Sequence, residues 1–146
     1  MDKKLFVTLN EFDSYCRELA VTISKEYDFD LIVGIVKAGV ICGAVLSFIM
    51  DKDFYTMKIS RREGSRVISR KPYLFVPVTD SVFGKKILLV DEISVTGETL
   101  IMAKDHILSK LAKEVKTCAI FKTQGRFSPD WYVVKTSNKI VPPWTK

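Results

Sequence analysis

The amino-terminal part of the chain alternates apolar and polar residues at helical spacing. The apolar positions are Leu9, Phe12, Cys16, Leu19, Ala20, Ile23 and Tyr27. Charged residues such as Glu11 and Arg17 lie between them, and an apolar stripe with this period is typical of a helix that packs on one face. We therefore predict an amphipathic surface helix over residues 9–27 that covers a sheet.

Shorter apolar runs in the rest of the chain predict strands and buried helices. The predicted strands are residues 31–36, 54–59, 73–78, 87–90, 115–121 and 131–134, and further helices are predicted over residues 40–50 and 100–113. The run 87–90 is apolar throughout, as expected of a parallel strand covered on both faces. Strands that alternate with helices predict the α/β class, with an open, mainly parallel sheet flanked by helices. We expect a single domain over residues 1–146, because no linker or repeat interrupts the pattern.

One apolar stretch has the length of a membrane span. Residues 31–50 carry Lys37 as their only charge, and about 20 apolar residues can cross a bilayer. A lysine near the bilayer centre costs about 2.5–3.5 kcal/mol, however, and glycines interrupt the stretch. We therefore favour a strand, a loop and a helix here, and expect no membrane partner.

Composition narrows the classes of protein further. The chain has 146 residues, 47% of them hydrophobic and 27% charged, which is enough for one sizeable core. Cys16, Cys42 and Cys118 are far apart and form no CxxC pair, so a disulfide framework and a structural zinc site are disfavoured. His106 is the only histidine, which disfavours hydrolase triads. No long apolar signal lies at the start of the sequence, and we expect a reduced, cytoplasmic protein.

Positive charge is concentrated in one stretch. The formal charge of +6 comes from 23 basic and 17 acidic residues, which favours an anionic partner. Between Lys58 and Lys71 the acid Glu63 stands alone among basic residues. Residues 61–71 contain no periodic apolar face that could order them, so we predict a long mobile loop between two strands.

The segment from residue 87 to residue 100 carries the strongest chemical signal. A buried strand is followed by adjacent carboxylates, Asp91 and Glu92, and by a short loop. The helix start that comes next consists of Thr96, Gly97, Glu98 and Thr99. Free backbone N–H groups and the helix dipole make such a start an anion cradle suited to phosphate. The alternative is an ordinary capped helix after an acidic loop.

This segment closely resembles the phosphoribosyl-pyrophosphate signature of the type I phosphoribosyltransferases, with four apolar residues, two acids, three variable residues and Thr-Gly-x-Thr. The resemblance implies that Asp91 and Glu92 hold the ribose hydroxyls of the donor and that residues 96–99 hold its 5-phosphate. It also implies Mg²⁺ beside Asp91 and Glu92, bridging pyrophosphate and ribose hydroxyls, since this ion prefers oxygen ligands. A Walker-type nucleotide site is excluded because no GxxxxGK[ST] occurs.

A second junction between a strand and a helix matches the same family. Lys37, Ala38 and Gly39 resemble the loop that offers backbone amides to pyrophosphate. Small residues between a strand and a helix are common, so this loop alone is weak evidence for the family. Its position one strand and one helix before the stronger motif strengthens the match.

The carboxyl-terminal part resembles the xanthine–guanine and hypoxanthine (6-oxopurine) members of the family, which have a small hood, here residues 122–146. Lys122 matches the lysine that contacts the purine 6-oxo group, and Lys139 and Ile140 match base-binding positions. A solvated lysine at a strand end is the alternative for Lys122. Trp131 and Trp144 are expected to pack in the fold rather than stack on a base.

Two residues depart from the family pattern. Val95 stands where most 6-oxopurine members have an aspartate that handles the proton on purine N7. Lys139 stands where the family tends to stack an aromatic residue on the base, and its aliphatic stem offers less contact area. Because Val95 cannot accept a proton, proton transfer would need water or another side chain, unless the substrate requires no proton transfer.

The resemblance implies transfer of a 5-phosphoribosyl group from phosphoribosyl pyrophosphate to a purine base, expected to be a 6-oxopurine, in purine salvage. It also implies a homodimer, and a lid in which Arg61, Arg62 and Arg66 fold over the donor. Val95 and Lys139 leave an alternative open: a non-catalytic regulator that senses phosphoribosyl pyrophosphate or a nucleotide and binds nucleic acid through the basic stretch. A nucleotide-binding module without transfer activity is a third alternative.

Overall fold

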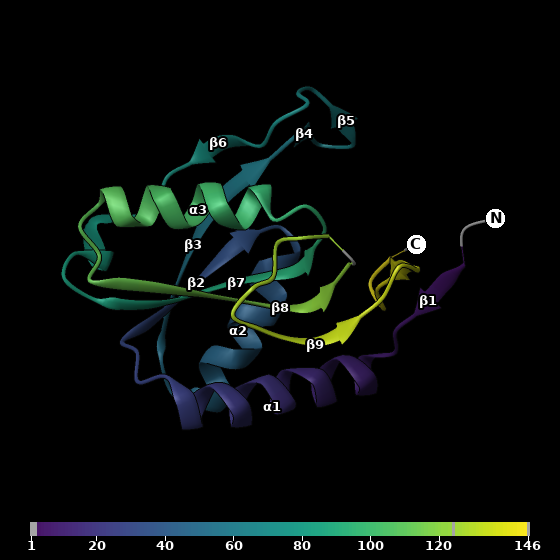
Figure 1. Ribbon diagram of the computed structural model, residues 1–146, viewed down its shortest axis with the longest axis horizontal. Helices are drawn as coiled ribbons and strands as arrows, with labels where there is room; N and C mark the ends of the chain where they lie inside the picture. Colours follow the sequence, from purple (N-terminus) through teal and green to yellow (C-terminus); the bar gives the residue numbers. More distant parts are fainter. Residues whose placement is uncertain (1–2, 124, 146) are drawn as a thin grey trace.

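A six-stranded sheet forms the centre of the molecule, in the order β6-β3-β2-β7-β8-β9 (Figure 1). The computed structural model describes residues 3–123 and 125–145. The strands are β2 (Leu31–Val36), β3 (Asp53–Ser60), β6 (Tyr73–Val76), β7 (Lys86–Ser94), β8 (Glu114–Lys122) and β9 (Trp131–Lys135). Neighbouring strands are parallel except for the antiparallel pair β3 and β6. The predicted α/β class with an open, mainly parallel sheet is confirmed.

Helices cover both faces of this sheet. Helices α1 (Leu9–Glu26) and α2 (Ala38–Met50) pack on one face, and α3 (Glu98–Ser109) packs on the other (Figure 1). Helix α1 begins where the pattern predicts because Thr8 and Glu11 form a capping box: the Glu11 N–H donates to Thr8 Oγ1, and the Thr8 N–H donates to Glu11 Oε1, each at 3.1 Å. Each face of the sheet therefore has its own apolar cluster.

Residues 31–50, the apolar stretch with the length of a membrane span, form β2 and α2. Within the described ranges, no helix combines the length and the apolar character that crossing a membrane requires. The predicted packing of the tryptophans is confirmed, because Trp144 meets Phe12 edge-on at 4.9 Å between centroids and Trp131 stacks on Tyr27 at 5.7 Å.

Two predicted boundaries are wrong by about four residues, whereas the others differ by at most two. Helix α3 ends at Ser109 instead of near Lys113, because Leu111 adopts a positive φ of 63°, a conformation that no glycine signalled in the sequence. Strand β7 continues through Ser94 instead of ending at Val90. The two acids that were expected after the strand are therefore part of it.

Several short elements were not predicted. Strands β1 (Lys4–Phe6) and β10 (Lys139–Val141) pair in parallel at one end of the molecule. Strands β4 (Arg62–Glu63) and β5 (Arg66–Val67) form a small hairpin inside the stretch predicted as a loop, and η1 (Asp80–Val82) is one 3₁₀ turn. Strands of two or three residues leave no periodic pattern in a sequence, which explains why they were missed.

The residues at the edges of the predicted ranges are only partly described. Gln124 and Lys146 of the predicted hood, and Met1 and Asp2 of the predicted domain, lie outside the described residues. The mobility predicted for residues 61–71 stays a prediction, although this stretch does contain the exposed hairpin β4–β5.

Candidate functional site

The order of the strands places a ligand site at the end of β2 and β7. From β2 the chain continues to β3 on one side, whereas from β7 it continues to β8 and β9 on the other side. Ligands of open α/β sheets bind beyond the carboxyl ends of the strands at such a reversal. Lys37 follows β2 and Gly39 lies in the first turn of α2, whereas the loop after β7 carries Thr96 and Gly97. The two predicted phosphate-binding segments are therefore neighbours.

A cavity of about 180 Å³ lies at this position. Its wall consists of Asp91, Ile93, Ser94, Val95, Thr96, Gly97, Glu98, Thr99 and Leu100, with Arg61 and Pro72 from the basic stretch. The structure thus brings the predicted 5-phosphate residues together with Asp91 and with one arginine of the predicted lid.

The start of α3 is shaped by Gly97, which precedes the helix with a φ of 84°. This conformation favours glycine, and a Cβ at this position would also overlap the ring of Phe127. Gly97 supplies no side-chain cap, and the Glu98 N–H donates to Thr96 Oγ1 at 3.3 Å. The N–H groups that follow Glu98 in the first turn can serve an anion, together with the positive end of the helix dipole.

The two carboxyls of β7 are placed differently. Asp91 lines the cavity, and its Oδ1 accepts the Glu92 N–H at 2.8 Å. Burial raises the pKa of Asp91 to about 7, although that hydrogen bond lowers it in part. Glu92 is only 3% exposed, and its Oε2 has no hydrogen-bond partner within the described chain. Burial, and then the neighbouring charge of Asp91, raise the pKa of Glu92 to about 7.

An orphaned buried carboxylate oxygen is expected where a bound molecule supplies the missing hydrogen bond. Hydroxyl groups of a sugar fit Asp91 and Glu92, because each hydroxyl can donate to a carboxylate. Residues 3–123 and 125–145 contain no group of three or more His, Cys, Asp or Glu side chains placed to hold a metal. A divalent cation would fit here only if bound substrate and water provided most of its oxygen ligands, a mode that suits Mg²⁺.

The first turn of α2 touches the same carboxyl. A Cβ on Gly39 would lie 2.6 Å from the Val90 carbonyl oxygen and 3.4 Å from Asp91 Oδ1. Only glycine permits this close approach of the first turn of α2 to β7. Lys37 is exposed at the start of α2, and the Val36–Lys37 peptide is cis. Gly39 therefore lies against Asp91, although Lys37, Ala38 and Gly39 are not part of the cavity wall.

Lys122 is held at the end of β8, next to the phosphate loop. Its Cα pairs with that of Ser94, and its side chain is largely buried, with 7% of the residue exposed. The ammonium lies 5.6 Å from the ring centroid of Tyr132. This burial argues against the alternative of a solvated lysine, since lysine is rarely buried without a partner or a role.

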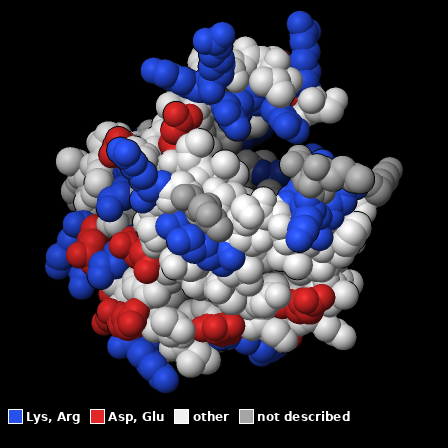
Figure 2. All heavy atoms as spheres, turned by 45° about the vertical axis from the view of Figure 1, so that its right-hand side comes forward, with Lys and Arg blue, Asp and Glu red and all other residues white. Residues whose placement is uncertain are grey.

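The other predicted site residues do not line the cavity; they are Lys37, Ala38, Gly39, Arg62, Arg66, Glu92, Lys122, Lys139 and Ile140. Arg62 and Arg66 lie in the exposed hairpin β4–β5. Figure 2 shows basic side chains gathered over this hairpin at the top of the view, above a hollow in the surface. Lys139 and Ile140 lie in β10, where they pair with Lys4 and Leu5 of β1.

Sequence reasoning missed Pro72 and Ser94, which line the cavity, and Phe127, which packs on Gly97. None of them belongs to a recognisable motif, so their positions depend on how the chain folds. The single histidine has a structural contact: His106 Nε2 accepts the Val78 N–H at 3.2 Å, and burial and Lys110 lower its pKa.

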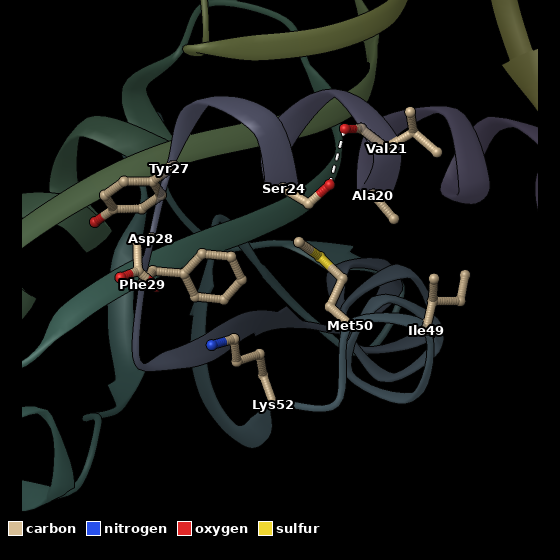
Figure 3. A pocket seen from close by; sticks show the side chains of 9 residues that line it. All are labelled: Ala20, Val21, Ser24, Tyr27, Asp28, Phe29, Ile49, Met50 and Lys52. Atoms are coloured by element: carbon tan, nitrogen blue, oxygen red, sulfur yellow. Dashed lines mark hydrogen bonds between the residues drawn. The ribbon is translucent and has the colours of Figure 1, made fainter.

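A larger cavity, about 520 Å³, lies at the opposite end of the sheet, between the ends of α1 and α2 (Figure 3). Phe29, Met50 and Lys52 are among its lining residues, and Lys52 lies 5.2 Å from the centroid of the Phe29 ring. It contains none of the predicted site residues. The chemistry therefore favours the smaller cavity, where carboxylates, a helix start and glycine loops meet.

Comparison with known proteins points to one family. The family model of the phosphoribosyl transferase domain matches residues 8–146. A hypoxanthine-guanine phosphoribosyltransferase from Aquifex aeolicus is 30% identical over 136 residues, which cover 88% of this chain and 76% of the relative. An adenine phosphoribosyltransferase from Pelodictyon phaeoclathratiforme is 35% identical over 88 residues, which cover 56% of this chain and 50% of the relative.

A solved structure shares the architecture. The purine phosphoribosyltransferase from Pyrococcus horikoshii superposes with a TM-score of 0.86 at 29% identity, covering 98% of this chain and 94% of that one. The matched residues include the cavity, both glycine loops and Lys122. The chain therefore belongs to the phosphoribosyltransferase family of enzymes.

Proposed function

We propose that the protein transfers the 5-phosphoribosyl group of phosphoribosyl pyrophosphate to a 6-oxopurine, giving the nucleotide and pyrophosphate, as in purine salvage. The observation that carries the choice of base is the buried Lys122 beside the phosphate loop. An ammonium group can only donate hydrogen bonds. It therefore favours a base with an oxo group over adenine, which presents an amino group at that position.

The proposed roles follow the arrangement of the loops. Residues 96–99 at the start of α3 hold the 5-phosphate, and Asp91 and Glu92 accept hydrogen bonds from the ribose hydroxyls. Lys37, Ala38 and Gly39 hold the pyrophosphate, while Lys122 and the backbone near Lys139 and Ile140 hold the base. During transfer the bond from C1 of the ribose to pyrophosphate breaks, a bond from C1 to a base nitrogen forms, and the proton of that nitrogen passes to water or to the released pyrophosphate.

Magnesium fits the proposed site only as an ion shared with substrate, because no three acids of the described residues are placed to hold it. When bound, it neutralises charge on the leaving pyrophosphate. The protein contributes position: buried carboxyls orient the ribose, and fixed amides stabilise the phosphates without reorganising.

The basic hairpin is proposed to act as a lid. Arg61 already lines the cavity, and Arg62 and Arg66 are exposed on the segment that follows it. Closure would bring positive charge to the pyrophosphate and exclude water from the reactive sugar. In this proposal residues 1–146 act as one catalytic unit, with the lid at residues 61–71 and the hood at residues 122–146.

A homodimer is proposed through the outer face of α2. This helix contains no charged residue, and Phe48 on it is 86% exposed, with Ile41 37% exposed. Tyr55 of the adjacent strand β3 is also 37% exposed. An exposed apolar surface of this kind marks an interface, and a second copy can cover it symmetrically.

A regulator that binds nucleic acid is the second candidate, and the exposure of the basic hairpin is the observation that favours it. Neutralising Arg61, Arg62 and Arg66 together separates the two candidates. A lid predicts a large fall in turnover with the fold preserved. A regulator predicts loss of RNA or DNA retention at low salt, with any transfer activity untouched.

The proposed function is tested by incubating the protein with magnesium, phosphoribosyl pyrophosphate and one base at a time, and measuring pyrophosphate release. The bases are hypoxanthine, guanine, xanthine, adenine, uracil and orotate. We expect release with the 6-oxopurines, whereas release with adenine alone would contradict the choice of base.

Lys122→Met keeps the apolar stem and removes the ammonium, and should weaken 6-oxopurine binding by roughly tenfold or more, the value of a hydrogen bond to a charged group. The matched control is Lys135→Met, because Lys135 is the exposed partner of Lys122 in β9. Equal losses in both variants, or an equal loss for adenine, would remove Lys122 from base recognition.

A further inference from the structure

The phosphate loop between β7 and α3 is held from outside by a residue that belongs to no motif. Thr123 follows β8 directly, and its N–H donates to the Ser94 carbonyl at 3.0 Å. Its Oγ1 donates to the Val95 carbonyl, also at 3.0 Å. The first bond prolongs the ladder between β7 and β8 by one step. In the second bond a side-chain hydroxyl, and not a backbone N–H, binds the next carbonyl of the loop, where the loop leaves the sheet.

The hydroxyl bond fixes the direction of the next amide. In a trans peptide the C=O and the N–H point in opposite directions, and the Val95–Thr96 peptide is trans. A Val95 carbonyl directed at Thr123 therefore directs the Thr96 N–H away from Thr123. Thr96 lines the cavity in which residues 96–99 are proposed to hold the phosphate.

Two further contacts lie on the same side of the loop. A Cβ on Gly125 would lie 2.9 Å from the Val95 carbonyl oxygen, so the chain passes close to that peptide. The Phe127 ring packs on Gly97. These contacts limit how far the loop can move outward, and the Thr123 hydroxyl adds a directional hydrogen bond to the Val95 carbonyl.

We propose that Thr123 is a positioning residue for the donor phosphate: its hydroxyl holds the Val95 carbonyl and thereby aims the Thr96 amide into the phosphate cradle. The proposal rests on the proposed function, because it names a residue that serves the same site. Valine at position 123 has the shape of threonine and keeps the backbone N–H, so Thr123→Val removes the hydroxyl bond alone.

Ribose 5-phosphate is the probe, since it carries the phosphate and the ribose hydroxyls without the pyrophosphate or the base. Calorimetric titration should show its Kd raised roughly two- to tenfold in Thr123→Val, the usual net value of one hydrogen bond. The KM for phosphoribosyl pyrophosphate should rise by a similar factor. The KM for the base should stay unchanged, and Thr123→Ser should restore both donor constants.

The matched control is Thr79→Val. Its hydroxyl bonds Ser81 Oγ at 2.6 Å in the segment before η1, which lies outside the cavity wall. It should leave the affinity for ribose 5-phosphate unchanged. An unchanged Kd in Thr123→Val, no rescue by serine, or an equal weakening of donor and base with a lowered Tm would overturn the positioning role.

The result is separable from the proposed reaction. If the unaltered protein binds ribose 5-phosphate but releases pyrophosphate with no base, the transfer reaction fails while the role of Thr123 is still decided by the Kd values. If it does not bind ribose 5-phosphate, both the proposed site and the role of Thr123 are wrong.

Discussion

Glu92 is a buried acid, and its replacement by glutamine should change both the pH dependence of stability and the affinity for the donor. It is 3% exposed, and its Oε2 has no hydrogen-bond partner within the described chain. Burial and the charge of Asp91 raise its pKa from the ordinary value of 4.5 to about 7. The charged form is therefore less stable in the folded protein than in the unfolded chain.

The sign of the pH dependence follows from this shift. Because the folded pKa lies above the unfolded value, the folded protein holds the proton more tightly. The stabilisation is fully present below about pH 4.5 and is lost as the pH rises through about 7. A shift of this size corresponds to about 3 kcal/mol.

Glu92→Gln removes the ionisation and therefore this pH dependence. The buried amide costs roughly 1–3 kcal/mol at every pH where it lacks partners. We expect the variant to be less stable than the unaltered protein near pH 4.5 and equally or more stable at pH 8. The difference in unfolding free energy between the two proteins should change by about 3 kcal/mol across this range.

Urea unfolding of the metal-free protein, followed by tryptophan fluorescence between pH 4.5 and pH 8, measures this difference. Glu18→Gln is the control, because Glu18 is exposed on α1. The affinity for ribose 5-phosphate should fall in Glu92→Gln and not in the control. A difference in unfolding free energy that is independent of pH would refute the account of the buried carboxyl.

Three other changes probe the site and the assembly. Val95→Asp should raise turnover on a 6-oxopurine by up to about 10²–10⁴-fold if the missing base limits the reaction, and unchanged turnover with donor binding preserved would place proton transfer elsewhere. Gly97→Ala should destabilise the fold by roughly 1–3 kcal/mol through its positive φ, and by more through overlap with Phe127. Gly84→Ala, with a φ of 68° and no atom near its Cβ, isolates the first effect, so equal losses in urea unfolding would exclude the overlap. Phe48→Lys should convert a dimer to a monomer in size-exclusion chromatography, and an unchanged elution volume would place the interface elsewhere.

The parts of the fold that the sequence predicts correctly are those with a local physical signal. The capping box at Thr8 and Glu11 and the apolar stripe after it define α1, and the uninterrupted apolar run before Asp91 defines a strand covered on both faces. The helix end at Leu111 was missed because a positive φ at leucine has no local cause in the sequence. The hairpin β4–β5 was missed because its strands are only two residues long.

The candidate site, like the fold, has parts that the sequence predicts and parts that only the structure shows. Asp91 and Gly97 were predicted from residues that are close in the chain: an apolar run, two acids and Thr-Gly, which together resemble a family signature. The sequence could not show that Glu92 is buried without a hydrogen-bond partner while Asp91 faces the cavity, since this depends on how α2 packs against β7. It also could not separate Arg61, which lines the cavity, from Arg62, which does not.

The sequence by itself determined the α/β class, the two glycine loops and the acids between them, because periodicity and neighbouring residues carry that information. Only the tertiary structure decided which distant residues complete the site. Thr123 reaches Val95, and Phe127 reaches Gly97, because β8 lies beside β7 in the sheet. Contacts of this kind depend on the order of the strands and on packing across the sheet, so no local sequence pattern predicts them.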